Sequence, residues 1–346
     1  MMKLLHSADW HLDSPIQGRT GSQTRQLKDA LLSVPQKIAT LAKAEGCDLM
    51  LLSGDLFDAA HSTTTLAYVQ KVLGEVGMPV FISPGNHDPF GPGSPWTQPG
   101  WPENVHIFTG TMESVPLPHL DCRVYGAGFQ TSESPALLQD FRAECRERYA
   151  IGALHGDPTQ LNSPHNPITR LQVQESGLDY LALGHIHKAD SFHTGDTLCA
   201  WPGCPMGRGF DELGEKGVFI VTLDGSCEAR FVPLDVPKFH WLRCAPDALS
   251  QVLPAAGNSD FYRIDLVGES EPVDTDALAA ALPGFPNLQL RDQTVPPLDL
   301  WANAGDDTLE GVFFQLLKES DADADVVELA ARISRQILLE QEVELP

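Results

Sequence analysis

The sequence has no long apolar run, and this absence excludes membrane-spanning segments. No window approaches the roughly 20 consecutive apolar residues that cross a bilayer as a helix. The first residues, Met1 to Leu5, lead directly to His6, without the apolar stretch and small-residue cleavage site of a secretory signal. We therefore expect a soluble globular protein that lies in the cytoplasm and does not bind a membrane.

Paired cysteines are also absent. The seven cysteines are odd in number and scattered, and no C-x-x-C pair occurs among them. This pattern argues against a disulfide framework and against a zinc ribbon. Free thiols that are buried or half-buried are the expected state of Cys47, Cys122, Cys145, Cys199, Cys204, Cys227 and Cys244.

Basic residues are scarce. Lys and Arg together number 23 against 47 Asp and Glu, which gives a formal net charge of -24. A protein that holds a long stretch of nucleic acid usually presents a basic surface. Unaided, this chain should bind DNA weakly. Bound divalent metals would supply positive charge where a phosphate lies, and a basic partner would supply the rest.

The 346 residues exceed the usual size of one domain. As far as residue 235, short apolar runs alternate with helical periodicity, which is typical of a layered α/β fold. Helices are predicted at 24–45 and 64–76. Strands are predicted at 3–7, 48–53, 79–83, 150–154 and 180–183, with a closing hairpin at 218–223 and 229–233.

The pattern changes after Pro237. Strand-like runs at 239–244, 261–267 and 287–290 alternate with helical segments at 246–253 and 274–281, which predicts a small α+β unit over 236–300. Two amphipathic helices follow in 301–346, one around Leu309 to Leu317 and one around Val326 to Ile337. Their apolar stripes pack either on this chain or on a partner.

A stretch rich in Pro and Gly, residues 89–102, reads as a loop. It contains Trp96 and Trp101. Two interpretations are open: the indoles stack on nucleotide bases as substrate contacts, or they anchor the loop on the core.

Five polar clusters follow apolar, strand-like runs. In an open α/β sheet the loops at the carboxyl ends of the strands converge on one crevice, so these clusters should meet there. Each cluster alone is a weak signal, whereas all five in this order are a strong one. They are Asp9-Trp10-His11, Gly54-Asp55-Leu56-Phe57-Asp58, Gly85-Asn86-His87-Asp88, Leu154-His155-Gly156 and Gly184-His185-Ile186-His187.

Asp and His offer oxygen and neutral imidazole nitrogen, the mixture that borderline divalent metals accept. In D-x-H and H-x-H, alternate side chains of an extended segment share a face, so each pair can reach one metal cluster. Glycines before Asp55, Asn86 and His185 would let the chain turn sharply and bring backbone close to ions. We expect two divalent ions, with Mn²⁺ as the leading assignment and Fe²⁺, Mg²⁺ and Zn²⁺ as alternatives.

The motifs together resemble the calcineurin-like metallophosphoesterase superfamily. Residues 7–15, SADWHLDSP, with residues 54–58, GDLFD, resemble its DNA repair exonuclease branch, the SbcD- and YhaO-like nuclease subunits. Residues 202–212, PGCPMGRGFDE, are similar to the YhaO-like proteins. The resemblance implies an α/β/β/α core over 1–235, a capping domain at 236–300 and an ATPase-docking segment at 301–346. It also implies DNA, an SbcC-like SMC-type ATPase and a second copy of the chain as partners.

The resemblance also implies roles for individual residues. His87 would not be a ligand but would assist the leaving group while a metal-activated water attacks phosphorus, and Asp88 would orient its imidazole. Asp58 and Arg208 are further candidates for substrate contact, although an ion pair explains Arg208 equally well. One metal would be held by Asp9, His11 and His187, the other by Asn86, His155 and His185, with Asp55 bridging both.

Three functions compete at this point. The first is a DNA exonuclease or endonuclease acting in DNA repair, which the C-terminal additions favour. The second is a stand-alone phosphodiesterase or phosphatase on a small substrate, which the acidic charge favours. The third, a scaffold without catalysis, is disfavoured because every expected ligand type is present.

Overall fold

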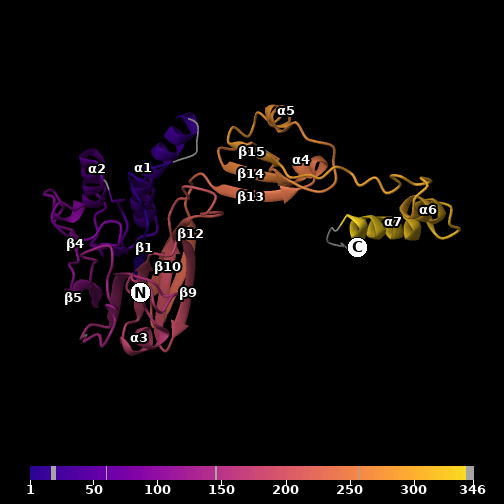
Figure 1. Ribbon diagram of the computed structural model, residues 1–346. Coiled ribbons are helices and arrows are strands. Elements are labelled where there is room, and N and C mark those ends of the chain that lie inside the picture. The colour runs from indigo at the N-terminus through magenta and orange to yellow at the C-terminus, as the bar shows by residue number, and fades with distance from the viewer. Residues whose placement is uncertain (17–20, 60, 145, 256, 340–346) are drawn as a thin grey trace. The chain divides into compact units, whose positions relative to one another are not determined.

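The computed structural model describes residues 1–16, 21–59, 61–144, 146–255 and 257–339 (Figure 1). The chain divides into two compact units. The first comprises Met1–His240 with Ser259–Tyr262, and the second comprises Trp241–Asn258 with Arg263–Pro346. The first unit is thus discontinuous in sequence, because residues 259–262 belong to it.

A six-stranded sheet contains the first strands of the chain. Its strands β1 to β4 run parallel, and β11 and β12 extend it antiparallel beside β1. Short, fully buried apolar runs form its centre, as expected for parallel strands covered on both faces. In sheet order the strands are β12 (Cys227–Pro233), β11 (Gly217–Leu223), β1 (Met2–Ser7), β2 (Leu49–Leu52), β3 (Val80–Ile82) and β4 (Val105–Ile107).

A second six-stranded sheet contains the middle of the chain. Strands β6, β7, β8 and β10 are parallel, and antiparallel strands close both edges. In sheet order they are β5 (Glu113–Leu117), β6 (Cys122–Gly126), β7 (Tyr149–His155), β8 (Tyr180–Gly184), β10 (Thr197–Gly203) and β9 (Lys188–Thr194).

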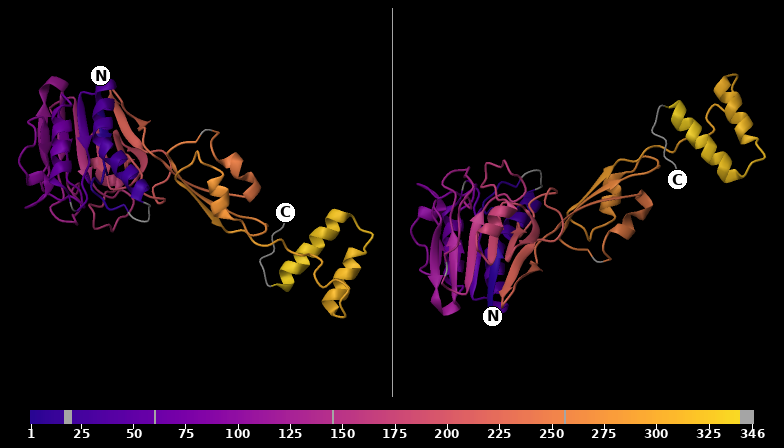
Figure 2. Two further views of the ribbon diagram at one scale, coloured as in Figure 1. Left: turned by 90° about the horizontal axis from the view of Figure 1, so that it is seen from above. Right: turned by 90° about the horizontal axis from the view of Figure 1, so that it is seen from below.

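The two sheets pack face to face between layers of helix. One core joins the first sheet to α1 (Gly21–Ala44) and α2 (Thr63–Gly74), which begins at the N-cap Ser62. A second core lies between the sheets, and a third joins the second sheet to α3 (Arg170–Glu175). Figure 2 shows this layered unit from above and below. The predicted α/β/β/α core is confirmed.

The second unit contains a three-stranded sheet whose first residues belong to the first unit. Its order is β13 (Phe239–Cys244), β14 (Phe261–Leu266) and β15 (Leu288–Asp292), with α4 (Leu249–Val252) and α5 (Thr275–Ala280) between the strands along the chain. The helices α6 (Leu309–Lys318) and α7 (Ala324–Leu338) contact each other around Phe314 and Ala331. Within the described residues, no helix combines the length and the apolar character needed to span a bilayer.

Candidate metal centre

The polar clusters follow the carboxyl ends of strands from both sheets. Asp9 and His11 come after β1, Asp55 after β2 and Asn86 after β3, while the second sheet supplies His155 at the end of β7 and His185 and His187 after β8. Because parallel strands end at the same edge, these loops converge. The structure brings all seven predicted ligands together.

The first predicted ligand set is Asp9, His11 and His187. One ligand atom from each lies within 4.8 Å of the others. The Nε2 atoms of His11 and His187 are 3.2 Å apart, and both Asp9 oxygens accept the backbone N–H of His185 at 3.0 and 3.1 Å. Asp9 and His11 are buried, whereas the side chain of His187 is 31% exposed, so this donor set borders solvent on one side.

The second predicted set meets at the amide oxygen of Asn86. This oxygen lies 2.8 Å from His155 Nε2 and 3.1 Å from His185 Nδ1. The carboxylate of Asp55 lies between the two sets, because its Oδ2 is 3.7 Å from His11 Nε2 and 3.4 Å from His155 Nε2. Asp55 is thus placed to contact an ion in either set.

Backbone strain is concentrated at these residues. Asp9, His11, Asp55 and His185 have φ values of 54°, 47°, 54° and 101°, in the region that residues with a side chain rarely occupy. Such strain persists only where the surrounding structure enforces it, and it is common at functional sites. Four of the seven predicted ligands therefore have strained backbone conformations with positive φ.

Two glycines allow the loops to approach. A Cβ at Gly85 would lie 2.2 Å from Asp55 Oδ1 and 2.7 Å from its backbone nitrogen, and one at Gly54 would lie 2.4 Å from His155 Nδ1. Gly54 also has a φ of +87°. These two glycines, before Asp55 and Asn86, thus leave room for the side chains of two predicted ligands.

The donor set fits divalent cations. The Nδ1 of His155 lies 2.9 Å from the Ser53 carbonyl and donates to it, which leaves the Nε2 lone pair directed at the Asn86 oxygen. Two electron-pair donors at 2.8 Å call for a cation between them. Burial lowers the pKa of His185 to about 4 and depresses the pKa of His11 still further, so both imidazoles are neutral at neutral pH, the form that binds metal.

Glu212 holds the ligand His187 in place, a contact that sequence reasoning missed. Its Oε1 lies 2.7 Å from His187 Nδ1, which turns Nε2 toward the metal centre. Burial raises the pKa of Glu212, but hydrogen bonds from His187 and Arg208 outweigh it and leave the pKa well below its usual range. The position of Glu212 in the segment 202–212, which has the family resemblance, was the one available signal.

Arg208 is paired with the same carboxylate. Its NH2 group lies 2.7 Å from Glu212 Oε1, and its backbone N–H donates to Oε2 at 2.7 Å. The interpretation of Arg208 as an ion-pair partner thus matches the structure. Its guanidinium fork is thus occupied by Glu212 and is not free to bind a phosphate as a bidentate donor.

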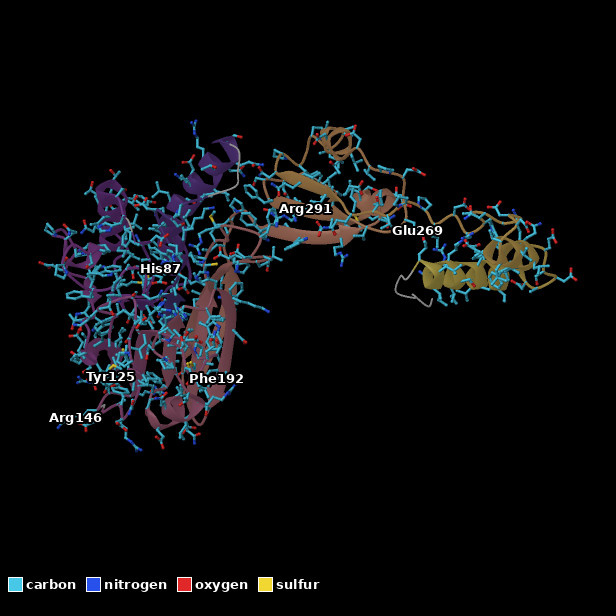
Figure 3. The ribbon with its side chains drawn as sticks, in the orientation of Figure 1. His87, Tyr125, Arg146, Phe192, Glu269 and Arg291 are labelled. Carbon is cyan, nitrogen blue, oxygen red and sulfur yellow. The ribbon has the colours of Figure 1, made fainter. Side chains whose placement is uncertain are left out.

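His87 lies beside the metal centre. Figure 3 labels its side chain. Its ring is 4.7 Å from the ring of His11, and its Nδ1 lies 2.8 Å from Asp58 Oδ1. The prediction that Asp88 orients this imidazole is wrong. Asp88 is buried and instead accepts backbone N–H groups of Leu56, Phe57 and Gly85.

The loop tryptophans lie at the core. Trp96 is only 4% exposed, its indole N–H donates to the Asp88 carbonyl, and its ring stacks on Trp101 at 5.4 Å. The half-buried Trp101 donates to the Pro95 carbonyl at 3.0 Å. Trp96 cannot stack on a base in this conformation, because its ring is buried within the protein, so the anchoring interpretation holds for it.

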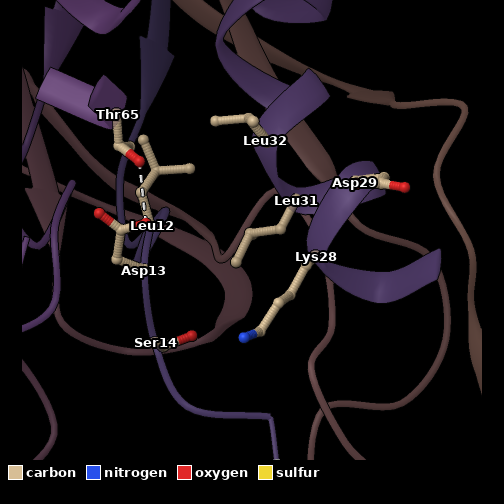
Figure 4. A pocket seen from close by; sticks show the side chains of 8 residues that line it. All are labelled: Leu12, Asp13, Ser14, Lys28, Asp29, Leu31, Leu32 and Thr65. Atoms are coloured by element: carbon tan, nitrogen blue, oxygen red, sulfur yellow. Dashed lines mark hydrogen bonds between the residues drawn. The ribbon is translucent and has the colours of Figure 1, made fainter. Parts of the chain in front are cut away.

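The loop after β1 is fastened to α2. Asp13 accepts the hydroxyl of Thr65 at 2.9 Å and the backbone N–H of Ser62 at 2.7 Å, next to a cavity of about 240 Å³ (Figure 4). Lys28 and Ser14 also line this cavity. Asp13 therefore fixes the segment that carries Asp9 and His11.

Comparison with known families matches residues 2–189 to the calcineurin-like phosphoesterase family. The matched range covers more than half of the chain and contains every predicted ligand. The chain belongs to the calcineurin-like phosphoesterase family. This family binds two divalent metals, and the ligand groups described above are the candidates for holding them.

Two curated relatives of this family member come from Bacillus subtilis. The uncharacterized metallophosphoesterase YhaO is 32% identical over 237 residues, which cover 64% of this chain and 57% of that protein. The SbcD component of the nuclease SbcCD is 26% identical over 273 residues, 66% of this chain and 68% of that protein. A solved dimetal phosphatase from Danio rerio is 12% identical, with a TM-score of 0.46, over 67% of this chain and 97% of that one.

Proposed function

We propose that this phosphoesterase hydrolyses phosphodiester bonds of DNA with two Mn²⁺ ions, as a nuclease in DNA repair. The observation that carries the proposal is the position of His87. Its side chain is 44% exposed and adjoins both His11 and the carboxylate of Asp58. An imidazole beside a metal centre, outside the predicted ligand sets and open to solvent, is suited to contact a substrate.

Each group has a part in the reaction. When bound, the two ions would supply positive charge for the phosphoryl oxygens and lower the pKa of a water molecule. Asp9, His11 and His187 would hold one ion, Asn86, His155 and His185 the other, and Asp55 both.

His87 would donate a proton to the departing 3′-oxygen. Asp58 accepts at Nδ1 of that ring, which leaves Nε2 as the nitrogen that faces the substrate.

Two features support DNA over a small ester. One relative, the SbcD component of SbcCD, is named as part of a nuclease, and its similarity extends over 273 residues, beyond the family-matched range. The second unit adds an α+β segment, for which we propose the role of a capping domain over 236–300. The net charge of -24 weighs against unaided DNA binding, so we propose that the bound ions and a partner supply the missing positive charge.

The test is hydrolysis by the purified chain with Mn²⁺. End-labelled duplex and single-stranded DNA are compared with an aryl phosphodiester and an aryl phosphomonoester, with chelated protein as the blank. DNA cleavage that requires Mn²⁺ is the expected result. Turnover of the small esters alone would overturn the DNA substrate and establish the alternative, a small-molecule phosphodiesterase or phosphatase.

We propose further that α6 and α7 dock an SMC-like ATPase of the SbcC type. These two helices expose a row of large apolar side chains, since Leu309 is 90% exposed, Leu316 66% and Ile337 60%. Apolar residues at this spacing on amphipathic helices are typical of a surface that packs on a partner helix.

Copurification tests the docking proposal. The chain is coexpressed with an SMC-like ATPase from the same genome, and the variant Leu309→Glu/Leu316→Glu is compared with the wild type. We expect a complex with the wild type that the variant loses while its hydrolysis of aryl esters is unchanged. A homodimer with no ATPase bound would overturn the docking assignment and favour self-association of the chain.

A further inference from the structure

A second cavity opens beside His87. It has a volume of about 350 Å³, within the range of roughly 300 to 1,000 Å³ that small-molecule sites occupy. Its wall comes from two loops that also serve the metal centre, one after β2 and one after β3, together with Gln130. Asp58 and His87 both line it, so the cavity is continuous with the group that faces the leaving oxygen.

The cavity is preformed. Under the loop after β3, Trp96 packs against Phe57 at 5.6 Å. Gly91 and Ser94 exchange two hydrogen bonds, at 3.0 and 3.2 Å, and Phe90 donates to the Phe129 carbonyl. These contacts hold the loop to the core and to the segment after β6, where Phe129 lies. A ligand would therefore meet a wall that is already ordered, and binding would cost little conformational entropy in the protein.

The lining favours a neutral group over a phosphate inside the cavity. No Lys or Arg is among the described residues that line the cavity, whereas Asp58 and Asp88 both are. A phosphate inside the cavity would find no Lys or Arg partner among these residues and would lie near the Asp58 carboxylate. A neutral ligand meets no such penalty.

The same lining suits a flat, neutral ring system. Three prolines, Pro89, Pro92 and Pro95, provide apolar surface, and the half-buried imidazole of His61 provides a face for stacking. The amide of Gln130 and the hydroxyl of Ser94 offer hydrogen bonds at the rim. These are the contacts that a nucleoside uses.

We propose that this cavity binds the nucleoside that carries the leaving 3′-oxygen, an inference that rests on the proposed DNA hydrolysis. A water oxygen forms the new bond to phosphorus while the bond from phosphorus to the 3′-oxygen breaks. The electron pair goes to the 3′-oxygen, which takes the proton from His87. The proton lost by the water restores His87, and the products are a free 3′-hydroxyl and a 5′-phosphate.

Dinucleotides that differ only on the leaving side test the proposal. The first carries a base on the leaving nucleoside, the second has an abasic sugar there, and the third carries the base and an added 5′-phosphate. We expect the base to lower KM about ten-fold, since one stacked base contributes about 1 to 3 kcal/mol. The added 5′-phosphate, which every internal nucleotide of DNA carries, should be tolerated and leave KM close to that of the base-bearing dinucleotide.

Variants of the cavity test whether the KM difference arises there. Gln130→Trp fills the cavity and His61→Ala removes its stacking face, so both should abolish the KM difference between the base-bearing and abasic substrates. Gln139→Trp, at an exposed position outside the lining, should retain it. Bound Mn²⁺ and thermal unfolding, measured for each variant, verify that the fold is intact.

The outcomes separate the two proposals. Equal KM values for the base-bearing and abasic dinucleotides, or a preference that persists in Gln130→Trp, would overturn the nucleoside cavity alone. Hydrolysis of aryl esters with no cleavage of any dinucleotide would overturn the DNA substrate and the cavity together.

Discussion

The Nδ1 of His87 lies 2.8 Å from a carboxylate oxygen of Asp58, although the two residues belong to loops after different strands. Asp58 is 20% exposed and His87 44%, so the pair borders both the metal centre and the adjoining cavity. This contact fixes the ring orientation and the nitrogen from which a proton can be donated.

Replacing Asp58 should slow hydrolysis without removing metal. We expect Asp58→Ala to lower kcat about 10- to 100-fold, the usual effect of losing a partner that orients a functional imidazole. The exposed Asp190→Asn serves as control and should match the wild type. Kinetics with an aryl phosphodiester and metal analysis by mass spectrometry check this. Loss of bound metal in Asp58→Ala would assign Asp58 to the ligands instead.

Replacing His87 should remove turnover and leave both ions bound. Proton donation by a positioned side chain contributes about 10²- to 10⁴-fold, so His87→Ala should lose at least 100-fold in kcat. Titration calorimetry with Mn²⁺ should give the wild-type stoichiometry. His119→Ala, at an exposed position far from the motifs in sequence, is the matched control. One ion instead of two in His87→Ala would contradict the assignment.

Asp88 should stabilise the fold and take no direct part in the reaction. Its carboxylate accepts four backbone N–H groups, those of Asp55, Leu56, Phe57 and Gly85. Since each buried donor left without a partner costs about 1 to 3 kcal/mol, we expect Asp88→Ala to lower the free energy of unfolding by at least about 3 kcal/mol. Urea unfolding of the metal-free protein measures this. Asp88→Asn keeps one acceptor oxygen and should be less destabilised than Asp88→Ala.

Gly85→Ala should damage the metal centre. The new Cβ would lie 2.2 Å from Asp55 Oδ1, so the carboxylate between the two ligand sets must move. We expect weaker Mn²⁺ binding, by about 10-fold or more, and a matching loss of activity. Gly21→Ala at the start of α1, where nothing lies within 4 Å of the added carbon, is the control and should bind Mn²⁺ as the wild type does. An unchanged affinity of Gly85→Ala for Mn²⁺ would contradict this prediction and show that the loop shifts to accommodate the added carbon.

The buried His6 should make the protein sensitive to mild acid. Burial lowers its pKa to about 3, and its Nδ1 lies 2.7 Å from the Tyr180 hydroxyl. The unfolded chain takes up a proton near pH 6.5 while the folded chain resists it, so this part of the stability is complete above pH 6.5 and is lost as the pH falls toward 3. Between pH 6.5 and 5 the loss amounts to about 2 kcal/mol.

Chemical denaturation at several pH values in the presence of a chelator tests this. His6→Gln should show a shallower fall in unfolding free energy between pH 6.5 and 5 than the wild type. His193→Gln, at an exposed position, should keep the wild-type slope. Identical slopes for all three proteins would remove His6 as the cause.

Two buried apolar strands illustrate what the sequence predicted, and two polar edge strands illustrate what it missed. The runs Leu49–Leu52 and Tyr180–Gly184 are buried throughout and almost entirely apolar, so the strands they form were expected. The edge strand β9, Lys188–Thr194, alternates in burial but consists mostly of polar or charged residues, and no apolar run marked it. The edge strand β5 contains Pro116, and proline inside a run argues against a strand in the sequence pattern.

The same contrast holds at the site. Asp9, His11 and His187 lie in D-x-H and H-x-H motifs, which together with the other three clusters indicate metal binding. Glu212 and Asp58 act through contacts between loops separated by 25 and 29 residues from their histidine partners. Such contacts depend on strand order, which periodicity does not specify.

The position of β1 determines when the first sheet can be completed during synthesis of the chain. Residues 2–7 pair with β2 on one side and with β11, residues 217–223, on the other. The last predicted ligand, His187, also emerges long after Asp9. During translation the first strand must therefore wait for more than 200 residues before its second neighbour exists, so the nascent chain passes through a long period with an open sheet edge, in need of shielding from aggregation.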